Sequence, residues 1–476
     1  MSAAFTDEPT LRDQLNRADW VKWFACNLRN CQTPYVFGVH GDWGSGKTSF
    51  LHQLYFHLTG RPVAKNQQIG CPADPFAQER KNGPPIVTVW FEAWRFQHDP
   101  APVVALLQHM RKQLTLDVQL VRKASKLTEV TVRSLLGMMD KIAAGIYSEV
   151  VPIPHPDAIE KIGEKYEAER FEMVSSSAAI REQLEEVIKQ LISEKGRIII
   201  LVDDLDRCQP EAAFKLLEGI KIYLNLPSCV FVLAMDHRNL ERALAQCLPG
   251  AARDPKTGFP LPGAVQQARE YLEKICQDVW QLPLIPTLKH EEFLRRQFFD
   301  EEKNSRPGDE EFAATFESIL KSLAVETCLP ANARKLKAYA NTLRRFVFHC
   351  LPHAGEKSPD GETWHARMLL IMSCLYQFHP ELYRRLESRP RFYNEIVEWA
   401  RSGLYFNKVF ENIEIAGSGA GATGGGLPGD DPPAGPFVNV PDPAVGNVFR
   451  LRTLVIDHGP VTEDEVTHYL LRYARV

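Results

Sequence analysis

The chain has 476 residues, of which 44% are hydrophobic and 24% are charged. At roughly 150 residues per domain, this length predicts about three domains and a large buried core. The 56 Lys and Arg residues nearly balance the 60 Asp and Glu residues, for a net charge of -4. This balance excludes a broadly basic nucleic-acid-binding surface, although it leaves room for a local basic patch. The hydrophobic content with so little net charge also excludes a wholly disordered chain.

The ten cysteines are scattered, without a CxxC pair or the spacing of zinc ligands. We therefore expect reduced, structural cysteines and a cytoplasmic protein. The N-terminal residues lack the apolar stretch of a signal peptide, and no run reaches the ~18 apolar residues of a membrane helix. The nearest run, residues 134–151, is interrupted by Asp140, Lys141 and Glu149. It predicts a helical subdomain or an oligomer contact, with peripheral membrane contact as the alternative.

Hydrophobic spacing predicts the first elements of the chain. We expect a helix over 11–31, a short buried strand over 35–40 and a second helix over 49–58. The segment 60–85 is rich in Gly, Pro and Asn and is typical of a loop. The β-branched and aromatic run 86–94 predicts another strand.

The middle of the chain continues this alternation. The pattern is helical over about 100–195, with a break at VVPIPHPD. The elements expected next are a strand over 197–204, a helix over 210–226, a strand over 229–236 and a helix over 239–248. Continuous apolar strands between helices predict an α/β fold with a mostly parallel sheet flanked by helices and carrying a helical insertion.

After about residue 287 the strand-like runs stop, and the pattern becomes helical. The Gly- and Pro-rich segment AGSGAGATGGGLPGDDPPAGP is typical of a flexible linker. The sequence therefore predicts an α/β core over 1–289, an all-helical region over 290–415, a linker over 416–436 and a tail over 437–476 with one short helix near 463–473.

A phosphate-binding motif lies between the first strand and the second helix. The residues GDWGSGKT match GxxxxGK[ST] in full, in the strand–helix context that this motif requires. Glycines let successive backbone N–H groups point at phosphate oxygens, and the helix N-terminus adds its dipole. We expect Lys47 to act catalytically on the β- and γ-phosphates and Thr48 to bind Mg²⁺. The predicted nucleotide-binding residues are Gly41, Asp42, Trp43, Gly44, Ser45, Gly46, Lys47, Thr48 and Ser49.

A second, acidic motif reads IIILVDDLDR over 198–207. A buried apolar strand places an acid rigidly at the carboxyl edge of a parallel sheet, where a ligand of Mg²⁺ is needed. We assign Asp203 to the metal and Asp204 to the catalytic task of orienting or deprotonating the attacking water, although the two roles can be exchanged. Arg207 is either a catalytic residue that stabilises γ-phosphate charge or the partner of an acid.

These motifs resemble those of the KAP P-loop NTPases. The resemblance rests on VFGVHGDWGSGKTSFLHQL (36–54), VWFEAWRFQ (89–97), IIILVDDLDRC (198–208) with CVFVLAMDHRNLERAL (229–244), and YLEKICQDVWQLPLIP (271–286) with NARKLKAYANTL (332–343). It implies an extra strand between the P-loop strand and the acidic strand, binding of ATP with Mg²⁺, slow hydrolysis and a helical segment that closes over the nucleotide. Many members carry transmembrane helices before the acidic motif, and this chain shows no adequate span there.

The resemblance also implies roles outside these two motifs. The NARKLK segment matches the family's basic motif, with Ala in place of the usual Pro, and makes Arg334 a catalytic candidate that senses the γ-phosphate. Its alternative is a solvated basic helix face. Asp236 is either a polar sensor or the N-cap of the next helix. Trp94 beside Arg95 either stacks on adenine or serves core packing and surface charge.

Together the motifs predict an Mg²⁺-dependent ATPase that acts as a nucleotide-driven switch in assembly or signalling. Analogy with the family suggests bacterial defence. We expect protein partners or self-assembly through the helical regions. One alternative is a non-catalytic scaffold that binds ATP, which the intact Lys47, Thr48, Asp203 and Asp204 disfavour. The other is a nucleic-acid motor that uses the basic stripe 334–345.

Overall fold

The computed structural model describes residues 8–63, 86–116, 129–150, 176–192, 196–248, 260–283, 290–298, 329–350, 362–402 and 448–470. They belong to two compact units, a core of Pro9–Pro283 and a helical unit of Leu284–Val476 with Met1–Glu8. Most of the predicted loop 60–85, and all of the predicted linker 416–436, lie outside the described residues.

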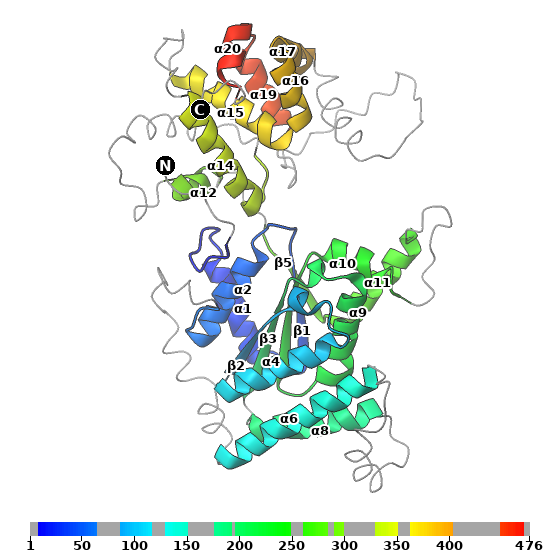
Figure 1. Cartoon of the computed structure of the whole chain (residues 1–476). Helices are drawn as coiled ribbons and strands as arrows, with labels where there is room; N and C mark the ends of the chain where they lie inside the picture. The colour runs from blue at the N-terminus through cyan, green and yellow to red at the C-terminus, as the bar shows by residue number, and fades with distance from the viewer. Residues whose placement is uncertain are drawn as a thin grey trace. The chain divides into compact units, whose positions relative to one another are not determined.

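In the described part of the core, five parallel strands form one sheet in the order β2-β3-β4-β1-β5 (Figure 1). They are β1 (Tyr35–His40), β2 (Ile86–Glu92), β3 (Arg197–Asp203), β4 (Cys229–Met235) and β5 (Asp278–Gln281). The predicted α/β fold is confirmed, and β4 is the extra strand between β1 and the acidic strand β3. The edge strand β5 was not predicted, because its four residues, DVWQ, are too few and too exposed to show a pattern.

The inner residues of the three central strands are apolar because both faces of the sheet are covered. On β3, Ile198, Ile200 and Val202 pack into one hydrophobic cluster. Ile199 and Leu201, which alternate with them, pack into a second cluster on the opposite face. This two-residue period explains why the run RIIILVD shows no polar alternation.

Helices cover both faces. The face that carries Ile199 is covered by α1 (Ala18–Asn30) and α2 (Lys47–Thr59). Helices from four later segments pack into the cluster on the other face. They are α4 (Pro102–Leu116), α9 (Pro210–Gly219) with the π-helical turn Ile220–Leu224, α10 (His237–Leu244) and α11 (Pro262–Ile275).

The predicted helix over 11–31 begins only at Ala18. The Asp13 carboxylate accepts hydrogen bonds from the backbone N–H groups of Arg17 and Ala18, both at 2.8 Å. These bonds satisfy donors of the first helical turn and stop the helix from extending backwards. Residues 8–17 therefore form a non-helical N-terminal segment.

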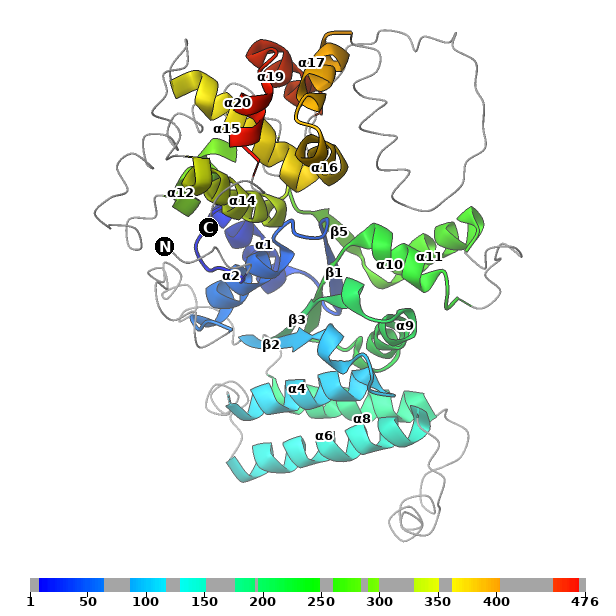
Figure 2. The same cartoon turned by 45° about the horizontal axis from the view of Figure 1, so that its top comes forward.

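The insertion contains α6 (Glu129–Val150) and α8 (Ser176–Leu191), and α6 packs against both α4 and α8 (Figure 2). Leu135, Met139, Ile142 and Ile146 of α6 are buried in the cluster that also covers β3. The buried apolar residues of α6 are thus used in a helical subdomain, one of the predicted alternatives.

The structure bears on two predicted features, the absence of a membrane-spanning helix and the reduced state of the cysteines. Within the described residues, no helix combines the length and the apolarity that a bilayer crossing requires. The cysteines whose side chains are described are all free thiols.

The helical unit has its own core, in which Tyr339, Phe346, Tyr383 and Tyr393 are almost fully buried. Its described helices are α12 (His290–Phe298), α14 (Ala333–Cys350), α15 (Glu362–Phe378), α16 (Pro380–Ser388), α17 (Phe392–Ser402), α19 (Val448–His458) and α20 (Glu463–His468). No strand occurs among its described residues, and the predicted all-helical region 290–415 stays a prediction.

The tail was predicted to carry one short helix, and this is wrong, because α19 precedes α20. Leu451, Leu454 and Val455 of α19 are buried, and α19 packs against α15 and α17. The Asn394 side chain exchanges two hydrogen bonds with the backbone of Val461. The tail is therefore part of the core of the helical unit.

Candidate phosphate-binding site

The phosphate loop connects β1 to α2 at the carboxyl edge of the sheet. Gly44 and Gly46 have φ angles of 85° and 90°, which side-chain-bearing residues rarely adopt. A Cβ atom on Gly41 would lie 2.5 Å from the Ser45 hydroxyl oxygen, so the loop also closes too tightly for a side chain there. The Gly41 N–H donates to the Met235 carbonyl at 3.2 Å, which anchors the loop to β4.

Lys47 is folded back into the loop. Its ammonium donates to the Gly41 carbonyl at 2.7 Å and to the Asp42 carbonyl at 3.4 Å. It also forms an ion pair with Asp206, with 3.3 Å between Nζ and Oδ2, and each side chain is less than a tenth exposed. The cation thus lies inside the loop, with the Asp206 carboxylate as its counter-ion.

Asp203 ends β3 beside the start of α2. Its side chain accepts a hydrogen bond from Thr48, while burial and the neighbouring Asp204 raise its pKa to about 7. Its Oδ1 atom is buried without a hydrogen-bond partner among the described residues. A hydroxyl and an adjoining carboxylate with a free oxygen fit Mg²⁺, which prefers oxygen ligands and retains several waters.

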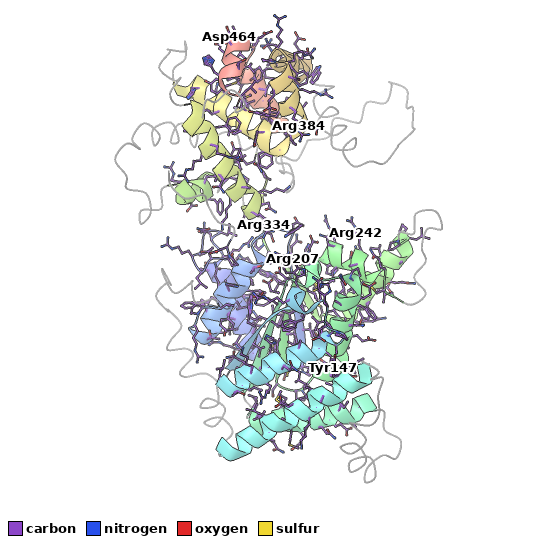
Figure 3. The ribbon with its side chains drawn as sticks, viewed as in Figure 1. Tyr147, Arg207, Arg242, Arg334, Arg384 and Asp464 are labelled. Atoms are coloured by element: carbon purple, nitrogen blue, oxygen red, sulfur yellow. The ribbon has the colours of Figure 1, made fainter. Side chains whose placement is uncertain are left out.

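Asp204 and Arg207 form a second ion pair. Asp204 has a φ of 57°, a left-handed conformation that residues other than glycine rarely adopt. Its carboxylate lies 3.0 Å from Nε of Arg207. The Arg207 guanidinium is 6.0 Å from the ring centre of Trp43, a cation–π contact across the loop. Figure 3 labels Arg207 at this end of the core. The pairing predicted for Arg207 is therefore present.

Burial raises the pKa of Asp204, with Asp206 and Glu92 acting in the same direction, while Arg207 opposes them. Its carboxylate is thus made more basic and remains partly accessible, the properties that a general base needs.

The comparisons with known proteins agree with this geometry. The KAP family P-loop domain matches residues 19–348, more than half of the chain. The chain belongs to the KAP family of P-loop domains. The phage T7 exclusion protein of Escherichia coli (strain K12) is 23% identical over 295 residues. That match covers 58% of this chain and 34% of the relative, so the chain spans about a third of the relative's length.

Membership of this family implies nucleotide binding, and the predicted nucleotide-binding residues form the loop and the start of α2. Asp203, Asp204 and Arg207 lie at the same edge, as their contacts with Thr48 and Trp43 show. Trp43 itself is 63% exposed, whereas Ser45 is buried.

The sequence did not predict that Asp206 links the phosphate loop to the start of α10. Besides pairing with Lys47, its carboxylate accepts the backbone N–H of Asp236 at 2.9 Å. Asp236 in turn caps α10 through Asn239, whose backbone and side-chain nitrogens both donate to it. The N-cap alternative for Asp236 is thus confirmed. The signal in the sequence was that Asp206 is the third acid of the acidic motif. The 3₁₀ turn Leu205–Arg207 brings this acid beside the loop, where it pairs with Lys47.

Sequence reasoning also missed the N-terminal segment of the KAP core. The Thr10 N–H donates to the Ser49 hydroxyl at 3.2 Å, and the Gln53 amide donates to the carbonyls of Thr10 and Arg12. This segment therefore runs along the first turns of α2, beside the phosphate loop.

Glu92 ends β2 in register with Asp203. It forms an ion pair with Arg95 and accepts a hydrogen bond from the Trp90 ring N–H at 3.2 Å. Trp94 is 48% exposed, so it does not serve as core packing. Its predicted stacking on adenine stays a prediction.

Arg334 lies on α14 of the helical unit (Figure 3). The Asn332 side chain accepts the Lys335 N–H at 3.1 Å and so caps the first turn of this helix. The NARKLK segment is therefore a helix start, and the sensor role of Arg334 stays a prediction.

Proposed function

We propose that the protein is an Mg²⁺-dependent ATPase that acts as a nucleotide-driven conformational switch. The observation that carries the proposal is the contact between Thr48 and Asp203 beside the paired Asp204 and Arg207. One edge of the sheet thereby holds a phosphate loop, a metal-binding pair and a carboxylate that faces an arginine. Each is a recurring part of phosphoryl-transfer sites.

The contacts support the following roles for the residues of the site. The loop N–H groups and Lys47 hold the phosphate chain, and Thr48 and Asp203 hold Mg²⁺. The metal would neutralise charge on the β- and γ-phosphate oxygens. Asp204 orients the attacking water and accepts its proton. Arg207 stabilises charge on the γ-phosphate after its guanidinium separates from Asp204. The contact with Trp43 keeps this guanidinium near the loop.

The switch would act through these same ion pairs. Lys47 is paired with Asp206, and Arg207 is paired with Asp204. A bound phosphate would compete with these carboxylates for the two cations. If Lys47 binds phosphate in place of Asp206, the Asp206 carboxylate loses its ion pair. The same carboxylate accepts the N–H of Asp236, the residue that caps α10. We therefore propose that phosphate occupancy is coupled to helix position.

The biological setting that we propose is bacterial defence, in assembly or signalling. It is supported by the name of one relative, the phage T7 exclusion protein, to which part of the chain is similar. Partner binding or self-assembly through the helical unit belongs to the same proposal.

Steady-state hydrolysis of ATP and of GTP tests the proposal. Lys47→Ala and Asp204→Asn should each lower turnover by about 10²-fold, from lost phosphate charge stabilisation and lost water positioning. Asp204→Asn should still bind ATP. Asp140→Asn, on the exposed face of α6, is the matched control and should be unaffected.

Equal turnover in the wild type and both variants would contradict the catalytic assignment. ATP binding without turnover at any protein concentration, or with any added partner, would favour a scaffold. Turnover per molecule that rises with protein concentration would support an oligomer that completes the site.

A further inference from the structure

Arg17 is a buried cation beside the phosphate loop. It is the residue before α1 and is only 5% exposed. Burial lowers its pKa to about 10, so it stays charged at neutral pH. Its guanidinium donates from Nη1 to the Ser45 carbonyl at 2.9 Å and from Nη2 to the Pro283 carbonyl at 2.5 Å. A buried charge is costly unless it is satisfied, and here two backbone carbonyls accept hydrogen bonds from it while the Asp13 carboxylate favours its charged form.

The bond to Ser45 has a consequence for the loop. In a trans peptide, the C=O of one residue and the N–H of the next point in opposite directions. Because Arg17 binds the Ser45 carbonyl, the Gly46 N–H is directed away from Arg17. A Cβ on Gly46 would lie 3.3 Å from Nη1 of Arg17, which shows how closely the guanidinium supports this turn.

The bond to Pro283 reaches the last residue of the core. Pro283 follows β5, whose neighbour Leu282 donates its N–H to the His40 carbonyl at 2.8 Å. His40 directly precedes the loop. The helical unit begins at the next residue, Leu284. Arg17 thus joins the turn of the phosphate loop to the peptide by which the chain leaves the core.

We propose that Arg17 is a positioning residue for nucleotide binding: it holds the Ser45–Gly46 peptide in its phosphate-binding orientation and ties that peptide to Pro283. Changes at the loop on nucleotide binding then reach the exit of the core. This inference rests on the proposed function, because it assumes that the loop binds a nucleotide.

Arginine suits this task better than lysine does. Its planar fork offers separate nitrogens to two acceptors, whereas one ammonium on a flexible stem cannot hold two distant carbonyls in fixed geometry. Arg17→Lys should therefore keep the charge and lose part of the positioning. Arg17→Met removes both.

ADP binding measured by titration calorimetry is the first test, with Lys22→Met as the matched control for a cation on the exposed face of α1. We expect ADP affinity to fall about tenfold in Arg17→Met and about threefold in Arg17→Lys, and to stay unchanged in Lys22→Met. The circular dichroism spectrum of each variant checks that it is folded. If Arg17→Met does not fold, Arg17→Lys decides by the same measurement.

Hydrogen exchange at the Leu282 amide, at saturating ADP, separates positioning from a merely structural role. We expect ADP to slow this exchange in the wild type and in Lys22→Met, and to leave it unchanged in Arg17→Met. An equal response in Arg17→Met, or an unchanged ADP affinity in either Arg17 variant, would overturn the inference alone. Failure of ADP to bind the wild type would overturn the proposed function and this inference with it.

Discussion

Lys47 and Asp206 form an ion pair in which both side chains are less than a tenth exposed. A phosphate group that binds Lys47 must compete with this carboxylate. Asp206 also holds the backbone N–H of Asp236, which an amide oxygen can accept equally well. Asparagine at this position would therefore remove the competing charge and keep the hydrogen bond.

We predict that Asp206→Asn raises the affinity for ATP and ADP by about threefold to tenfold, because one negative charge leaves the neighbourhood of the phosphates. Fluorescence or calorimetric titration measures this, with Asp140→Asn as the control. A lower affinity in Asp206→Asn would mean that Asp206 orients Lys47 for phosphate instead of competing with phosphate.

At the scale of single elements, a helix end is determined by its capping partners as much as by its apolar pattern. The apolar spacing of 11–31 is helical, yet Asp13 binds the first N–H groups of α1 and fixes its start at Ala18. Conversely, Asp236 begins α10 where the strand pattern ends. The first case frees the N-terminal segment to contact α2.

The junction of α15 and α16 contains a titratable group. His379 lies between the two helices and is 7% exposed, and burial lowers its pKa to about 4. Since its unfolded pKa is near 6.5, the unfolded chain binds more protons between these values. The contribution of His379 to stability is therefore complete above pH 6.5 and is lost as the pH falls toward 4.

We predict that the helical unit loses up to ~3 kcal/mol of stability over this pH range, and that His379→Gln flattens the dependence. Denaturant unfolding at several pH values measures it, and His468→Gln, at an exposed position of α20, is the control. A pH dependence that is unchanged in His379→Gln would contradict this assignment.

At the scale of the whole molecule, the chain consists of two units with separate hydrophobic cores, and it passes between them at Glu8–Pro9 and at Pro283–Leu284. A ligand that binds one unit stabilises that unit directly. The phosphate loop belongs entirely to the core, whereas Arg334 and the tail belong to the helical unit.

We predict two unfolding transitions in scanning calorimetry, one for each unit. ADP at about 100 times its Kd should raise the Tm of the core transition by about 5 °C. Lys47→Ala should abolish this shift. A single transition, or an equal shift of both transitions, would show that the two units unfold as one.

Much of the fold and the site could be predicted from the sequence because the relevant residues are contiguous. The phosphate loop, its flanking strand and helix, and the acids that end β3 each occupy a single stretch of chain. Apolar runs specify buried strands, and glycines specify the loop, through local physical chemistry alone. The short, exposed β5 and the helix α19 after the predicted linker carried too weak a local pattern.

The tertiary structure alone decided which distant residues meet. Arg17 binds carbonyls that lie 28 and 266 residues away. Lys47 pairs with Asp206, and Arg207 lies over Trp43, across similarly long separations. Periodicity and composition describe a residue's own element, whereas these pairings depend on strand order and on the turns at the carboxyl edge of the sheet. The sequence determined the chemical groups of the site, and the packing of the sheet determined their partners.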